Sequence, residues 1–278
     1  MKFSKLIIVA LLVSAFSAYA TDSSLNEATY SLINDGISQT VNPDASNGKS
    51  VIVNGEAIYI GVTGWSDTGG AGNDLVVQGT NSSALKKWNA TWSNGVVTSG
   101  YGIQNDDNGD SHAIDNYNDF DMILLAFSEE VTLTDASFNW LKGDNGNKEI
   151  TVAGLDLDSS SPFLSNDSFT WSDAASHAVE GAIGHFGIAN TAENYYFNST
   201  FSNLSSAKYW LVGAYNTYFA DSNKIENNIK LKLSGIGFTT ETDATTPPPA
   251  PTPVSEPGAL ALMSIGLGLL AYRRKRRV

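Results

Sequence analysis

The chain contains no cysteine, and all of its arginines lie between Arg273 and Arg277. The absence of cysteine excludes a disulfide framework, a thiol nucleophile and a cysteine-bound metal. Between residues 21 and 255 only nine lysines stand against 28 acidic residues, which gives this part a net charge of −19. Such an acidic surface repels phosphate groups and anionic lipids. We therefore expect no nucleic acid partner and no peripheral membrane binding by this part.

Histidine is scarce too, because the chain has only His112, His177 and His185. Zinc sites favour closely spaced ligands or a helical His-x-x-x-His, which these positions do not provide. No Gly-x-Ser-x-Gly nucleophile motif occurs either. A hydrolase with two paired carboxylates stays open, since sequence does not show the distance between side chains. We expect a protein that is not an enzyme.

The first residues have the pattern of a secretory signal peptide. Lys2 and Lys5 precede an apolar run from Leu6 to Phe16, and the small residues Ala18 and Ala20 follow it. Signal peptidase cleaves after such a small-x-small pattern, so we assign residues 1–20 to a signal peptide. The alternative is an uncleaved N-terminal anchor.

The C-terminal end has three successive parts. A Thr- and Pro-rich linker at 241–253 precedes an apolar segment at 259–272, and the basic cluster follows as Arg273, Arg274, Lys275, Arg276 and Arg277. A helix over 259–272 is about 21 Å long, less than the roughly 30 Å of a bilayer core, so it spans only with thinning or snorkelling. Positive charge beside a membrane segment stays cytoplasmic, so we expect the preceding residues to be exported.

Between the linker and the apolar segment lies the sequence Val254-Ser255-Glu256-Pro257. This sequence, the Gly- and Leu-rich run from Gly258 to Ala271 and the basic cluster together resemble the PEP-CTERM sorting signal of bacterial proteins. The usual first proline of that motif is Ser255 here. The resemblance implies recognition of these four residues by a membrane-embedded exosortase, removal of the tail, and delivery to the cell surface or an extracellular matrix after transient anchoring in the inner membrane.

A second resemblance covers roughly Tyr101 to Val152. It consists of a Gly-Ile-x-Asn turn, an acidic stretch, the sequence His112-Ala113-Ile114-Asp115-Asn116, an aspartate-led apolar strand and Val131-Thr132-Leu133. This segment looks like the exosortase-dependent surface protein family, in which the pattern precedes a tryptophan-containing strand. Trp140 takes that place, and the resemblance implies no catalytic residues.

Residues 21–240 are predicted to form one all-β domain, a jelly-roll-like β-sandwich, because many short strand-like runs alternate with Gly, Asn, Asp and Ser. A hairpin is expected where Asn54-Gly55 separates Val51–Val53 from Glu56–Val62. Further strands are predicted at 74–78, 90–93, 96–98, 122–127, 131–134, 137–140, 150–155, 169–171, 195–197, 210–215 and 229–238. Short helices are predicted at 82–88 and 173–179.

Two of these strands carry a pattern that predicts their position. Met122–Phe127 is continuously apolar, so we expect a central strand covered on both faces. Ile229–Leu233 alternates apolar residues with Lys230 and Lys232, which favours a half-exposed strand near an edge of the sheet.

The acidic stretch offers hard oxygen ligands of the kind that calcium prefers. The candidates are Asp106, Asp107, Asp110 and Asp115. Their spacing does not match an EF-hand, and a solvated acidic turn is the simpler interpretation. We otherwise expect no cofactor.

The six tryptophans leave two functions open. Tryptophan is usually a core residue, but an exposed indole on a sandwich can stack on a sugar ring. We therefore expect an exported, non-enzymatic protein of the cell surface or extracellular matrix. The alternative is a carbohydrate-binding surface module that recognises an exopolysaccharide. Under either interpretation, the other expected partners of the protein are signal peptidase and the exosortase during export, and the membrane through segment 259–272.

Overall fold

The computed structural model divides the chain into two compact units, Met1–Glu241 and Thr242–Val278. Its described residues are 26–67, 77, 84–91, 96–105, 112–117, 119–143, 148–158, 161, 164, 169–191, 195–220, 228–240 and 272. Of the second unit only Tyr272 is described, and its side chain is exposed. The predicted signal peptide, linker and remaining membrane segment lie outside these ranges. Within them, no helix is both long enough and apolar enough for a membrane span.

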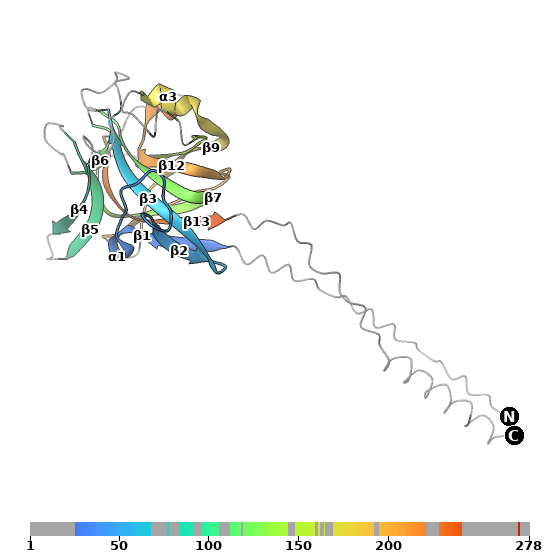
Figure 1. Cartoon of the computed structure of the whole chain (residues 1–278). Coiled ribbons are helices and arrows are strands. Elements are labelled where there is room, and N and C mark those ends of the chain that lie inside the picture. Colours follow the sequence, from blue (N-terminus) through green and yellow to red (C-terminus); the bar gives the residue numbers. More distant parts are fainter. Residues whose placement is uncertain are drawn as a thin grey trace, which may run out of the picture. The chain divides into compact units, whose positions relative to one another are not determined.

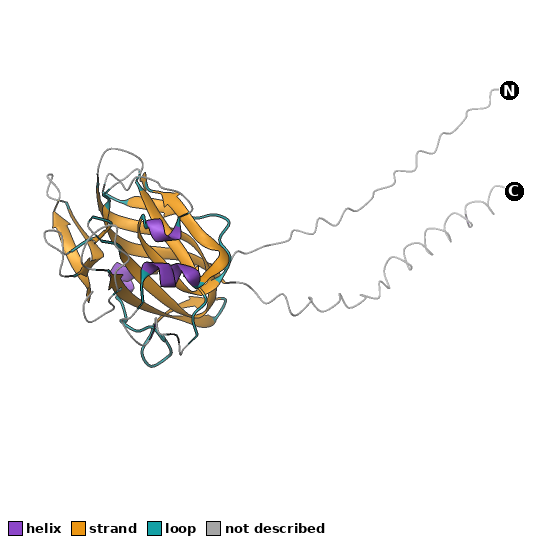
Figure 2. Ribbon diagram, turned by 90° about the horizontal axis from the view of Figure 1, so that it is seen from above, coloured by secondary structure: helices purple, strands orange, loops and turns teal. Residues whose placement is uncertain are grey.

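The first unit is all-β, as predicted, and its described strands pair in antiparallel fashion in one hydrogen-bonded network (Figures 1 and 2). The strands are β1 (Glu27–Ser31), β2 (Lys49–Val53), β3 (Glu56–Ser66), β4 (Ala84–Thr91), β5 (Val97–Gln104), β6 (Ile114–Asp115), β7 (Asp121–Lys142), β8 (Glu149–Leu155), β9 (Ala178–Gly187), β10 (Ala189–Asn190), β11 (Phe197–Thr200), β12 (Ala207–Ala214) and β13 (Lys230–Thr240). Short helical segments are α1 (Leu32–Asp35), α3 (Trp171–Ser176) and the 3-10 turn η1 (Thr217–Phe219). The main strand order is β4-β5-β13-β7-β12-β8-β9, with β1 and β6 also on β13 and β3 and β11 also on β7.

The predicted hairpin is confirmed as β2 and β3. Val53 pairs with Glu56, and the two residues between them, Asn54 and Gly55, have φ angles of 52° and 88°. Positive φ at both positions is the geometry that a type I′ turn requires, and asparagine and glycine adopt it at low cost. The local sequence alone therefore determines this turn.

Strand β7 is one continuous strand where the sequence predicted three. Its first part, Asp121–Phe127, pairs with β3 and β12. The second part, Val131–Lys142, pairs with β13 and, over part of its length, with β11, and only Val131 still pairs with β12, at Ala207. The polar residues Glu129 and Glu130, read from sequence as a break, are exposed but stay extended within the strand. They mark the point where β7 leaves one set of partners and joins another.

The main apolar core contains residues from both sets of strands. Ile123, Leu125 and Phe127 of β7 contribute to it from one set, and Leu233 and Ile236 of β13 from the other. The alternate residues of the first part of β7 pack in a second cluster with Trp171 of α3 and Phe219 of η1. The prediction that Met122–Phe127 is covered on both faces is therefore confirmed.

The predicted edge position of Ile229–Leu233 is wrong. Strand β13 is central, because β7 pairs with one side of it and β1, β5 and β6 pair with the other. Lys232 is only 9 % exposed. The alternation was read correctly, but the indoles of Trp88 and Trp140 lie against Lys232 and largely exclude water from it, whereas Lys230 is partly exposed.

Both helix predictions need correction. Residues 82–88 fall largely in strand β4, whose Leu85 pairs with Ile103 of β5 inside the main core. The second helix, α3, starts at Trp171, two residues before its predicted start, because Thr170 and Asp173 form a capping box. Trp171 is thus helical and not part of the strand predicted at 169–171. Of the strand predicted at 74–78 only Val77 is described, and it forms a single bridge with Phe169.

Candidate functional site

One face of the sheet, opposite the main core, gathers tryptophan and lysine side chains. Leu85 of β4, Leu141 of β7 and Leu231 of β13 point toward the core. Because side chains alternate along a strand, the residues next to these leucines point the other way. They are Lys86, Trp140, Lys142, Lys230 and Lys232, and Trp88, two residues after Lys86 on β4, lies on the same side. We call these six residues the tryptophan–lysine face.

The strand register brings these side chains together. Lys232 is opposite Trp140, and Lys230 is opposite Lys142. The ammonium Nζ of Lys232 lies 5.0 Å from the ring centroid of Trp140 and 5.9 Å from that of Trp88. An ammonium at this range is attracted to the electron-rich face of an indole. The two indoles therefore provide a favourable environment for a lysine that is largely removed from water.

Two glycines of β5 make this packing feasible. A Cβ on Gly100 would lie 2.6 Å from Cβ of Lys232, and one on Gly102 would lie 2.0 Å from the backbone oxygen of His112. With no side chain at either position, both neighbours can lie directly on β5. The His112 ring then stacks on Trp88 with a centroid distance of 4.1 Å and an interplanar angle of 12°.

An exposed tyrosine extends the same arrangement. Tyr117 is 45 % exposed, and the ammonium of Lys230 lies 4.5 Å from its ring centroid. The His112 side chain is exposed as well. Aromatic rings with lysines beside them thus reach solvent along this part of the molecule.

The other described tryptophans belong to the interior. Trp65, Trp171 and Trp210 are buried, and Nε1 of Trp210 donates to the backbone oxygens of Val131 and Ala207 at 3.1 and 3.0 Å. Trp92 lies outside the described residues. Trp88 and Trp140 are partly exposed, so the described tryptophans that reach solvent are both on the tryptophan–lysine face.

The charge of this face differs from that of the rest of the body. Four of the nine lysines between residues 21 and 255 belong to it, while strands β4, β5 and β13 contain no aspartate or glutamate. Lys86 and Lys142 are exposed and Lys230 is partly exposed. Asp115 of β6, which is 3 % exposed, lies opposite Lys230 in the register and is the acidic residue beside these lysines. With four lysines to this one aspartate, the face is a cationic area on a strongly acidic protein.

A separate group of carboxylates lies buried where β3, β5 and β7 end or begin. Asp67, Asp119 and Asp121 are each at most 1 % exposed. The amide of Asn105 donates to Asp121 Oδ1 at 3.0 Å and to Ser66 Oγ at 3.0 Å, and Oδ1 of Asp67 accepts from the backbone N–H of Phe120 at 2.6 Å. These bonds hold three strand ends together. No sequence pattern predicted this group, although each aspartate lies at or near a strand end.

Asp115 is the one predicted calcium ligand that the structure describes. It is 3 % exposed, and its carboxylate accepts a hydrogen bond from the backbone N–H of Tyr117 at 2.9 Å. Asp106, Asp107 and Asp110 lie outside the described residues. Within the described ranges, no three histidine, cysteine or acidic residues are grouped in a way that could hold a metal ion. A calcium site in this loop stays a prediction.

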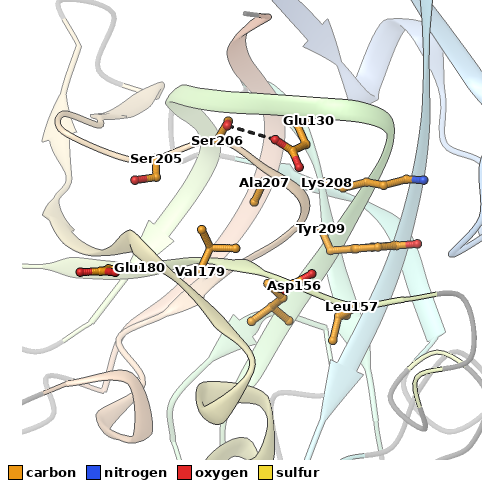
Figure 3. Close-up of a pocket in the computed structure, with 11 residues that line it drawn as sticks. Glu130, Asp156, Leu157, Val179, Glu180, Ser205, Ser206, Ala207, Lys208 and Tyr209 are labelled. Atoms are coloured by element: carbon orange, nitrogen blue, oxygen red, sulfur yellow. Dashed lines mark hydrogen bonds between the residues drawn. The ribbon is translucent and has the colours of Figure 1, made fainter.

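A groove of about 540 Å³ lies beside strand β12 (Figure 3). Its buried lining is Leu155, Leu157, Ala207 and Tyr209. Irregularities of register occur here in β12, between Ala207 and Tyr209, and in β8, between Ala153 and Leu155. Such bulges turn side chains away from the regular alternation. The groove therefore lies where both ladders depart from regular pairing.

The rim of this groove is mainly acidic. Glu130, Asp156 and Glu180 supply three carboxylates and Lys208 one ammonium, and Ser206 Oγ donates to Glu130 Oε2 at 3.3 Å. Burial and, to a smaller extent, the charge of Asp158 raise the pKa of the Tyr209 hydroxyl. This hydroxyl stays protonated at neutral pH. The groove consequently suits neutral or cationic groups better than anionic ones.

The other two histidines have structural contacts. His185 Nδ1 lies 3.0 Å from Thr151 Oγ1, and His177 Nδ1 lies 2.9 Å from the backbone oxygen of Asp173. The predicted sorting residues Val254, Ser255, Glu256 and Pro257, the basic residues 273–277 and the signal-peptide residues Ala18 and Ala20 lie outside the described residues.

Comparison with known proteins does not identify the chain: no protein family, no curated protein and no solved structure matches it.

Proposed function

We propose that this chain is an exported, non-enzymatic protein of the bacterial cell surface or extracellular matrix. The observation that carries the proposal is the three-part C-terminal sequence: Val254–Pro257, the apolar segment 259–272 and the basic cluster 273–277. It acts as a signal that an exosortase processes after the signal peptide has directed export. The all-β body, whose last strand ends at Thr240 just before the linker, is the part delivered.

We further propose that the body is a jelly-roll-like β-sandwich. In support, β7 changes partners at Glu129 and Glu130, and the main core contains side chains from the strands on either side of that change. A long strand that switches sheets can join two layers within one hydrogen-bonded network. This architecture exposes broad sheet faces, which suits a surface protein.

The sorting proposal is tested by the mass of the protein recovered outside the cells. We expect the mass to lack both residues 1–20 and the basic end of the tail. Glu256→Ala combined with Pro257→Ala should leave the tail attached and retain the protein in the membrane fraction. Ser255→Pro, which restores the usual motif, is the control and should be processed like the wild type. Wild-type protein outside the cells with residues 273–277 attached would contradict the proposal.

A second function, carbohydrate binding, is favoured by one specific observation. Trp88 and Trp140 are partly exposed on the same face of the sheet. Indole and other aromatic surfaces stack on the apolar faces of sugar rings. We expect binding on a glycan array that Trp140→Ala weakens, whereas Tyr196→Ala, at a tyrosine 40 % exposed outside this face, leaves it unchanged. No binding to any glycan would contradict this second function.

A further inference from the structure

We infer that the tryptophan–lysine face binds an anionic polysaccharide, a polymer whose sugar units carry carboxylates, through its lysines. This inference rests on the carbohydrate-binding function proposed above and names its ligand class. It is carried by the juxtaposition of aromatic rings and lysines on a face without acidic residues in its strands β4, β5 and β13.

The distribution of charge over the body favours an anionic ligand at this face. The body has a net charge of −19 and contains 28 acidic residues, yet none of these lies in strand β4, β5 or β13. At physiological ionic strength, charges more than about 8 Å apart at the surface are largely screened. A polymer bound along this face thus interacts mainly with the local lysines. The excess of acid elsewhere opposes binding of the same polymer to other parts of the body.

The spacing of the lysines favours a polymer as the ligand. Lys230 of β13 and Lys142 at the end of β7 are opposite each other, and Lys86 lies apart from this pair on β4, so the cations extend from β4 to β7. Such a spread suits repeated carboxylates along a chain better than one compact anion. Lys232, held between the two indoles, fixes the aromatic rings among these charges.

The aromatic rings favour a polysaccharide over other polyanions. Tyr117, His112 and Trp140 offer ring surface beside the lysines, and the apolar face of a pyranose can lie against such a ring. Nucleic acid is the competing class, because bases stack on aromatic rings as well. Both polymers carry about one negative charge per unit, so charge alone does not separate them. The carbohydrate-binding function proposed for the same face favours the polysaccharide, and binding of single-stranded DNA is the competing outcome of the test.

The test uses the full chain, purified in mild detergent, and two double variants of equal charge. Lys86→Gln with Lys142→Gln removes two exposed lysines from the face, and Lys49→Gln with Lys208→Gln removes two exposed lysines elsewhere. Binding to polygalacturonate is measured with EDTA present and compared with binding to neutral dextran. Equal urea midpoints for the two double variants establish that both are folded.

We expect the face variant to bind polygalacturonate roughly five- to tenfold more weakly than the wild type, since each exposed ion pair contributes a modest amount. The control variant should stay within about twofold of the wild type. Raising the NaCl concentration from about 0.05 to about 0.5 M should weaken wild-type binding at least tenfold, because salt screens exposed charges.

Each other outcome overturns the inference in a distinguishable way. Equal weakening in both double variants would show that the effect is one of net charge. Binding that requires added calcium would place the polymer on acidic residues. Binding to neutral glycans that depends on Trp140 but ignores both double variants would leave the carbohydrate function standing and remove only the anionic ligand. Tighter binding of single-stranded DNA than of polygalacturonate would assign the face to nucleic acid. Failure to bind any polymer would reject both proposals.

Discussion

The two parts of strand β7 have different surroundings. From Met122 to Phe127 every side chain is at most 1 % exposed, and alternate residues enter two separate apolar clusters. From Ser137 to Lys142 only one face enters the core, through Phe138 and Leu141, while Trp140 and Lys142 lie on the other. One strand thus contributes core packing at one end and, at the other, part of the face for which polymer binding is proposed.

The largest effect is expected from a cavity in the first part. Leu125→Ala should lower the free energy of unfolding by about 2–5 kcal/mol, because it removes buried methyl groups and leaves a void. Trp140→Ala, in the second part, should cost about 1 kcal/mol, since its indole is partly exposed. Urea unfolding of both variants measures the difference. Equal losses of unfolding free energy in the two variants would contradict the proposal that the first part of β7 stabilises the core and the second part forms an exposed face.

A smaller loss is expected where β5 supports the tryptophan–lysine face. In Gly102→Ala the new Cβ would meet the His112 backbone oxygen, which lies 2.0 Å from its position, so the chain must shift at a cost of about 1–3 kcal/mol. Tryptophan fluorescence should also change, because the His112 ring would move off Trp88. Gly187→Ala is the control, since nothing lies within 4 Å of its Cβ. Similar stabilities for the two variants would contradict the close packing of the His112 backbone on Gly102.

A third test concerns Lys232 itself. Lys232→Met keeps the length and the apolar stem of the side chain but removes the ammonium between the indoles. We expect a loss of about 1 kcal/mol, in the usual range for a cation over an aromatic ring. Lys208→Met, at an exposed lysine 5.9 Å from the Tyr209 ring, should cost less. Higher stability of Lys232→Met in thermal unfolding would show that burial of the ammonium outweighs the attraction.

The smallest effect should come from Asp135, on the second part of β7. Burial, with a further contribution from the charge of Glu27, raises the pKa of the Asp135 carboxyl, although a hydrogen bond from Thr134 lowers it in part. The folded protein therefore binds this proton more tightly than the unfolded chain, and stability falls as pH rises from about 4 through the raised pKa. Asp135→Asn should remove that fall and give a slightly higher Tm at pH 7. If Asp135→Asn has the same pH profile of Tm as the wild type, the raised pKa of Asp135 is contradicted.

Local patterns predicted the fold class and several elements. The Asn54-Gly55 turn and the buried strand at 122–127 needed no information beyond neighbouring residues, because turn geometry and continuous apolarity are local properties. The length of β7 was not predictable in this way. Its polar residues Glu129 and Glu130 resemble a loop in sequence, and only pairing with strands distant in the chain keeps the segment extended.

The tryptophan–lysine face was not predictable for a related reason. The alternation of Lys230 and Lys232 indicated a polar side of β13, and solvent was the simplest environment for it. The indoles of Trp88 and Trp140 come from strands far away in the sequence, and the lack of side chains at Gly100 and Gly102 allows the close packing. Single-residue propensities contain no information on such long-range register.

The position of β13 in the chain has a mechanical consequence. The strand carries Lys230 and Lys232 at its beginning, and its end at Thr240 is followed by the linker. If a polymer binds the lysines while segment 259–272 still anchors the linker in the membrane before processing, tension runs lengthwise through β13. The backbone bonds that join β13 to β7, from Lys230 to Thr240, then resist as a group in shear instead of opening one at a time.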